Sequence, residues 1–160
     1  MTRILFHIGD RKTGTSSLQS VLDLWDRSGA AAAHGVLYPR TGRRTDSRIN
    51  HVNLARETAG DARFDPRLGC WADLGPELRA SAAEVVIISS EAFEAVDPAL
   101  LRDAINRSLG VEAKVTVLGY FRPHHSRILA SYAQNTKVGR YFDSLAEFVR
   151  NTTRRRFSQV

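Results

Sequence analysis

The chain has 160 residues, with 23 Lys and Arg against 17 Asp and Glu, so its formal net charge is +6. Hydrophobic residues make up 42% of the chain and charged residues 25%, which are ordinary values for a globular domain and exclude wholesale disorder or a collagen-like chain. The single cysteine, Cys70, excludes an intrachain disulfide framework and a multi-cysteine zinc site, and no run approaches the ~20 apolar residues that span a bilayer.

The first half of the chain alternates short apolar runs with helical periodicity. Apolar residues recur three and four positions apart after Thr15, as they do on the buried face of a helix. These patterns predict a strand over 3–8, a helix over 15–33, a strand over 35–39, a polar loop over 40–50 and a helix over 51–59.

The second half continues this alternation. The patterns predict a helix over 71–83, strands over 85–88 and 111–121, and helices over 98–109, 123–138 and 144–150. Strands that alternate with helices and read as continuous apolar runs indicate an α/β fold of three layers, in which helices flank a mainly parallel central sheet. The sequence shows no internal repeat and no linker, so we expect one domain over 1–150 followed by a basic tail over 151–160.

The segment between the first strand and the first helix carries the main functional signal. It reads Arg11-Lys12-Thr13-Gly14-Thr15-Ser16-Ser17. The first N–H groups of a helix are unpaired and lie at the positive end of its dipole. Gly14 lets the backbone approach an anion, and the hydroxyls of Thr15, Ser16 and Ser17 can donate hydrogen bonds to it. Lys12 adds a full positive charge. We therefore expect these residues to bind phosphate. The segment is not a Walker A loop, because there the lysine directly follows a glycine, whereas Lys12 precedes Gly14.

The order Lys-Thr-Gly-Thr-Ser-Ser resembles the 5′-phosphosulfate loop of sulfotransferases, which use 3′-phosphoadenosine 5′-phosphosulfate (PAPS) as sulfuryl donor. Shorter likenesses to the bacterial, carbohydrate-modifying members lie at Tyr38-Pro39, at Asn50-His51 and at Ser89-Ser90-Glu91, so the resemblance covers about residues 4–141. It implies PAPS as the cofactor and a P-loop-NTPase-like sheet topology. No group of His, Asp and Glu has the spacing of metal ligands, so we expect no metal.

A second segment also resembles that family. The strand that ends at Phe121 is followed by Arg122-Pro123 and then by a helix with Ser126 and Ser131. In sulfotransferases such an arginine and a serine on the next helix bind the 3′-phosphate, and an arginine fork with a hydroxyl suits a phosphate dianion. The family serine usually lies eight residues after the arginine, where this chain has Ala130, so either Ser131 or Ser126 would take that role.

Sulfuryl transfer requires positioning, charge stabilisation and a base. The group passes in line from donor to acceptor oxygen, so the protein supplies mainly geometry and electrostatics. Lys12 would neutralise charge on the leaving oxygen. The general base that takes the acceptor's proton would be Glu91, which follows the strand over 85–88, or His51, and the resemblance leaves both open because branches of the family use either residue type.

Three other functions remain as alternatives. Sulfotransferase domains are commonly longer than this chain, so it could be a catalytically inactive homologue or fragment that binds PAPS or its product PAP. A P-loop-like phosphotransferase is disfavoured, because there is no Walker lysine and no aspartate for magnesium after the strand over 85–88. Nucleic-acid binding would use the basic end, since residues 122–160 hold 8 Lys and Arg against 2 Asp and Glu while residues 1–121 are balanced at 15 each. Only Phe157 adds an aromatic ring to that basic tail, so we expect no nucleic-acid partner.

The acceptor is expected to be a saccharide or another small molecule with a hydroxyl or amine. Four arginines in the polar loop would attract an acidic saccharide: Arg40, Arg43, Arg44 and Arg48. The first apolar run is too short for a secretory signal, so we expect a cytoplasmic protein without a membrane span. The sequence leaves the oligomeric state open.

Overall fold

The computed structural model describes residues 3–9, 13–43, 49–109 and 114–157, with Leu109 and residues 153–157 described by their backbone alone. The chain divides into two compact units, one of Met1–Asp10 with Gly14–Tyr120 and one of Arg11–Thr13 with Phe121–Val160. The first unit holds a sheet with its flanking helices, and the second holds two helices.

Four parallel strands form the sheet of the first unit, in the order β2-β3-β1-β4. Their bounds are β1 Arg3–Gly9, β2 Val36–Leu37, β3 Val85–Ser89 and β4 Lys114–Tyr120. The central strand β1 pairs with β3 from Arg3 to His7 and with β4 along its whole length. This arrangement confirms the prediction of an α/β fold with a parallel sheet flanked by helices.

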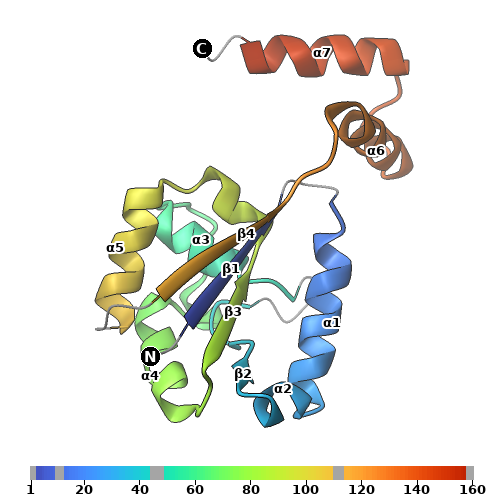
Figure 1. Cartoon of the computed structure of the whole chain (residues 1–160). Coiled ribbons are helices and arrows are strands. Elements are labelled where there is room, and N and C mark those ends of the chain that lie inside the picture. The colour runs from blue at the N-terminus through green and yellow to red at the C-terminus, as the bar shows by residue number, and fades with distance from the viewer. Residues whose placement is uncertain (1–2, 10–12, 44–48, 110–113, 158–160) are drawn as a thin grey trace. The chain divides into compact units, whose positions relative to one another are not determined.

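Helices cover both faces of this sheet (Figure 1). One face carries α1 (Thr15–Arg27) and the short α2 (Ala30–Ala33). The opposite face carries α3 (Val52–Thr58), α4 (Trp71–Ala80) and α5 (Pro98–Leu109). Two 3₁₀ turns complete the unit, η1 at Pro66–Leu68 and η2 at Glu91–Ala95.

The apolar core lies on the face of α3, α4 and α5. Alternate strand residues point to opposite faces of a sheet, and Ile4 and Phe6 of β1 belong to this core together with Leu54, Leu74 and Ile105 from the three helices. Phe6 is fully buried, and its ring meets the Phe93 ring edge to face at 5.3 Å between centroids. Leu5 lies between Ile4 and Phe6 on β1, and His7 follows Phe6. Both side chains therefore belong to the opposite face of the sheet, which carries α1.

Most predicted elements are confirmed, and the differences have local causes. The helix predicted over 15–33 is two helices, because Gly29 has a left-handed φ of 76° and the N–H groups of Ser28 and Gly29 bond back to the end of α1. The helix predicted over 71–83 ends at Ala80, since Ser81 is extended with a ψ of 149°. The helix over 98–109 is confirmed at both bounds, whereas residues 111–113 of the predicted last strand lie outside the described residues.

The second unit is a pair of helices, α6 (His124–Lys137) and α7 (Leu145–Phe157). Three rings pack them together: Tyr132, Tyr141 and Phe148 lie 5.0 to 6.2 Å apart between centroids. Gly139, at a φ of 67°, follows the end of α6, and its N–H bonds back to the Thr136 carbonyl oxygen at 3.1 Å. α7 continues seven residues past Arg150, so helix extends into the region where the sequence predicts a frayed basic tail.

Candidate functional site

The sheet topology makes the carboxyl ends of β1 and β3 the candidate ligand site. These two strands are neighbours, yet the chain leaves β1 toward α1 on one face and leaves β3 toward η2 and α5 on the other (Figure 1). In open α/β sheets, ligands bind in the crevice where neighbouring strands send their connections to opposite faces. The residues that follow β1 and those that follow β3 are therefore the candidates for binding a ligand.

The start of α1 has the geometry expected of an anion-binding helix N-terminus. Gly14 precedes the helix with a left-handed φ of 91°, and a Cβ at this position would meet nothing within 4 Å. Within the described residues no side chain caps the first turn, in which the Ser17 N–H bonds back to the Gly14 carbonyl at 3.0 Å. Thr15 is buried, whereas Ser16 and Ser17 are exposed. Thr13 is half-buried, and the predicted ligands Arg11 and Lys12 lie outside the described residues.

His51 has a place in the structure that uses both of its ring nitrogens. The ring is fully buried, its Nδ1 accepts a hydrogen bond from the Ser89 N–H at 3.0 Å, and its Nε2 donates to the Pro39 carbonyl oxygen at 2.9 Å. Burial lowers the pKa of His51 to about 3. The ring thus ties the chain after β2 to the end of β3, and neither nitrogen is available to take an acceptor's proton in this arrangement.

Glu91 is the base candidate whose carboxylate is not used by the fold. It is the first residue of η2, but Ser90 caps that turn, with its hydroxyl accepting from the Ala92 N–H at 3.2 Å. The Oε2 of Glu91 is buried and has no hydrogen-bond partner within the described part of the chain. Of the two residues predicted as base, Glu91 therefore has the geometry that suits the role.

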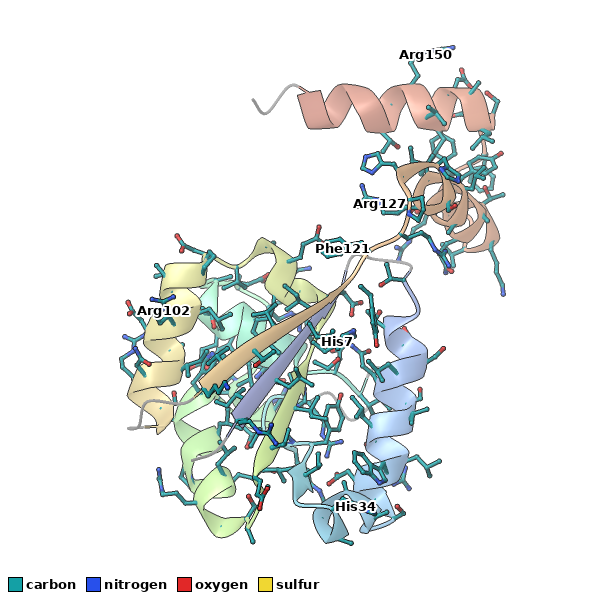
Figure 2. All side chains as sticks on the ribbon, viewed as in Figure 1. His7, His34, Arg102, Phe121, Arg127 and Arg150 are labelled. Atoms are coloured by element: carbon teal, nitrogen blue, oxygen red, sulfur yellow. The ribbon has the colours of Figure 1, made fainter. Side chains whose placement is uncertain are left out.

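A buried polar cluster beside Glu91 is not predicted from the sequence. His7 of β1, labelled in Figure 2, and Ser89 of β3 occupy paired positions, and their side chains bond at 2.8 Å between Nδ1 and Oγ. Gln19 of α1 reaches the same Ser89 Oγ with its Nε2 at 3.2 Å. All three side chains are buried. The only signal in the sequence is polar residues at buried strand ends and on the inner face of a helix.

The basic loop is less available to an acidic ligand than the sequence indicates. Arg43 is 8% exposed and bonds Asp23 and Asp26 of α1 at 2.9 and 2.8 Å, with its guanidinium 4.7 Å from the centre of the Tyr38 ring. This guanidinium is therefore committed to the fold. Arg40 remains exposed, and Arg44 and Arg48 lie outside the described residues.

The predicted 3′-phosphate residues belong to the second unit. Arg122 is exposed just before α6, while Ser126 and Ser131 are half-buried on that helix. Within the described residues, no hydrogen bond joins Arg122 to either serine. Ser126 and Ser131 are five residues apart and so lie on different sides of the helix, which leaves open which of them an anion held by Arg122 would meet.

A surface pocket of about 390 Å³ lies elsewhere in the first unit. It is bordered by α3, α4 and α5, and its lining includes Glu57, Trp71 and Arg107. No residue predicted for the site lines it, and the ends of β1 and β3 are not part of its wall.

Comparisons with known proteins add no relative. The chain matches no family model, and neither a curated protein nor a solved structure matches it. No helix among the described residues is both long and apolar enough to cross a membrane.

Proposed function

We propose that this protein is a PAPS-dependent sulfotransferase, which moves the sulfuryl group of PAPS to a hydroxyl or amine of a saccharide or another small molecule. The observation that carries the proposal is the segment Lys12-Thr13-Gly14-Thr15-Ser16-Ser17, which lies between the central strand and α1 in the sequence and whose last three residues begin α1. The strand order, with β1 between β3 and β4, supports a P-loop-NTPase-like topology.

The cofactor would be held by two groups of residues. The N–H groups at the start of α1, with the hydroxyls of Ser16 and Ser17, suit the 5′-phosphosulfate, and Lys12 would neutralise the oxygen from which the sulfuryl group departs. Arg122, with Ser131 or Ser126, suits the 3′-phosphate.

In the transfer step the acceptor oxygen forms a bond to sulfur while the bond between sulfur and the 5′-phosphate oxygen breaks. PAP leaves with the electron pair of that bond, and the acceptor's proton passes to the Glu91 carboxylate. The unpartnered Oε2 of Glu91, at the same sheet edge as the start of α1, supports this assignment.

Binding of PAP tests the cofactor site. PAP at about 100 times its Kd should raise the free energy of unfolding by about 2.7 kcal/mol, which corresponds to a rise in Tm of about 5–10 °C for a chain of this size. Lys12→Ala and Arg122→Ala should each remove most of that rise. Lys114→Ala is the matched control, because Lys114 is exposed at the amino end of β4. A folded protein that shows no rise at millimolar PAP would contradict the proposal.

Turnover separates an enzyme from an inactive PAPS-binding homologue. Release of PAP from PAPS in the presence of a panel of saccharide acceptors should be measurable and should fall at least 100-fold in Glu91→Gln. Unchanged PAP binding in that variant would place its effect on the chemical step. Binding of PAP with no turnover of any acceptor would favour the inactive homologue.

A further inference from the structure

Two buried polar atoms at the carboxyl edge of β1 and β3 have no hydrogen-bond partner within the described residues: the Nε2 of His7 and the Oε2 of Glu91. His7 is only 1% exposed. A buried polar atom without a partner is costly, so such atoms are rare and each one calls for an explanation, such as a role in a functional site. His7 lies near the carboxyl end of β1 and Glu91 follows the neighbouring strand β3, so both residues are at the switch point of the sheet.

The hydrogen bonds behind His7 favour one position for its ring proton. The Gln19 amide nitrogen can only donate, so it occupies a lone pair of the Ser89 hydroxyl. The Ser89 hydroxyl keeps its hydrogen and a second lone pair, and we infer that the hydrogen is donated to His7 Nδ1, which lies 2.8 Å away. Burial lowers the pKa of His7, so the ring is neutral at pH 7, and with Nδ1 as acceptor its single proton is on Nε2.

Glu91 offers the complementary atom. Its charge acts on the His7 ring, because it raises the pKa of His7 against the larger effect of burial. A carboxylate only accepts hydrogen bonds, whereas the Nε2–H of His7 only donates. A hydroxyl complements both atoms, because its oxygen can accept from His7 and its hydrogen can be donated to Glu91.

We propose that His7 and Glu91 together bind the hydroxyl group that accepts the sulfuryl group. This assignment rests on the proposed function. His7 Nε2–H would hold one lone pair of the acceptor oxygen and leave the other lone pair free to attack sulfur, while the hydroxyl proton passes to Glu91. Gln19 and Ser89 are the positioning residues that keep the ring in its tautomer. The assignment also implies that the acceptor reacts through a hydroxyl rather than an amine, because the single lone pair of an amine nitrogen cannot both accept from Nε2–H and attack sulfur.

The tautomer is tested first, in the free protein with ¹⁵N-labelled histidine. At pH 7 the ¹⁵N and ¹H spectra should show His7 neutral with its proton on Nε2, and the signal should be identified by its loss in His7→Gln. Glu91→Gln should shift the His7 signals, whereas Glu94→Gln, an exposed residue of the same turn, should leave them unchanged. A proton on Nδ1, or no response to Glu91→Gln, would overturn the pairing. Neither measurement needs PAP or an acceptor, so the result is independent of the proposed function.

The hydroxyl is tested next, with water as the smallest probe. We expect a cross-peak between the His7 Nε2–H and a bound water in the wild type, and its loss in Glu91→Leu. A direct hydrogen bond from Nε2–H to the Glu91 carboxylate, or no water contact at all, would overturn the proposal.

Two substitutions of His7 connect the pair to catalysis once an acceptor is known. The Gln amide can reach the position of Nε2, whereas the shorter Asn amide reaches only that of Nδ1. His7→Gln should therefore keep the acceptor KM within about threefold of the wild type, and His7→Asn should raise it at least 10-fold, with the KM for PAPS unchanged in both. Equal effects of the two variants on the KM for PAPS and for the acceptor would show a merely structural histidine.

Discussion

At the scale of single residues, the two buried histidines of the sheet edge differ in what their Nε2 atoms meet. The Nε2 of His51 donates to the Pro39 carbonyl, whereas the Nε2 of His7 has no partner among the described residues. Both rings are buried, and burial lowers the pKa of both. Residue type and burial are therefore the same in the two cases, and the hydrogen-bond partners distinguish a structural histidine from a candidate site residue.

The lowered pKa of His51 gives a pH dependence of stability. The unfolded chain takes up a proton near the ordinary value of 6.5, whereas the folded ring takes it up only near 3. The unfolded state therefore binds more protons between these values, and the free energy of unfolding should fall as the pH drops from 6.5 toward 3, by up to about 1.4 kcal/mol per pH unit from this group. Urea unfolding at pH 7, 5.5 and 4.5 measures this slope.

Two variants isolate the contribution of His51. His51→Gln should be less stable at pH 7, but its free energy of unfolding should depend less steeply on pH. His7 also has a lowered pKa, so the dependence that remains should have the same direction. His34→Gln, at an exposed position after α2, should keep the wild-type slope. A wild-type slope in His51→Gln would contradict the assignment.

At the scale of elements, the strands and most helices follow from local patterns, whereas the polar cluster does not. A parallel strand buried on both faces reads as a continuous apolar run, so β1 and β3 are evident in the sequence. The break between α1 and α2 depends on the positive φ of Gly29, which neighbouring alanines conceal because they favour helix. His7, Gln19 and Ser89 meet only through the parallel register and the packing of α1, across separations of 82 and 70 residues that no local pattern spans.

The contact between α4 and α5 depends on one glycine. A Cβ at Gly75 would overlap the carbonyl oxygen of Ser108. Helix propensity alone favours Gly75→Ala by about 0.5–1 kcal/mol, but the overlap with backbone should cost about 1–3 kcal/mol. We therefore expect the variant to lower the free energy of unfolding in urea. Ala80→Ser, exposed at the end of the same helix, should change it by less than about 0.5 kcal/mol, and a Gly75→Ala protein more stable than the wild type would refute the packing argument.

At the scale of the whole molecule, the net charge of +6 is carried by residues 122–160. Of those basic residues, only Arg122 is assigned to the cofactor, and Arg154, Arg155 and Arg156 follow much later in α7. The net charge of the chain is therefore a poor guide to its ligand. A site for one nucleotide needs only a few cationic side chains in fixed places, whereas long-range electrostatic attraction depends on the net charge.

Replacing the three arginines of α7 separates these two roles. Arg154→Ala/Arg155→Ala/Arg156→Ala should leave the Tm rise caused by PAP within about 1 °C of the wild type, whereas Arg122→Ala should remove most of it. The same triple variant should abolish any salt-dependent retention on immobilised DNA. If the triple variant keeps its fold by circular dichroism but loses the Tm rise caused by PAP, the phosphate site would have to be assigned to α7 instead.

The central position of β1 also sets the order in which the molecule can assemble. β1 is synthesised first, yet its partners begin at Val85 and Lys114. At about 5–20 residues per second on the ribosome, β3 is synthesised several seconds after β1. The closure of such long loops also slows folding. The strand that leads into the candidate anion-binding turn is thus made early but completes its pairing late, so newly made chains should acquire affinity for PAP only after β4 has emerged.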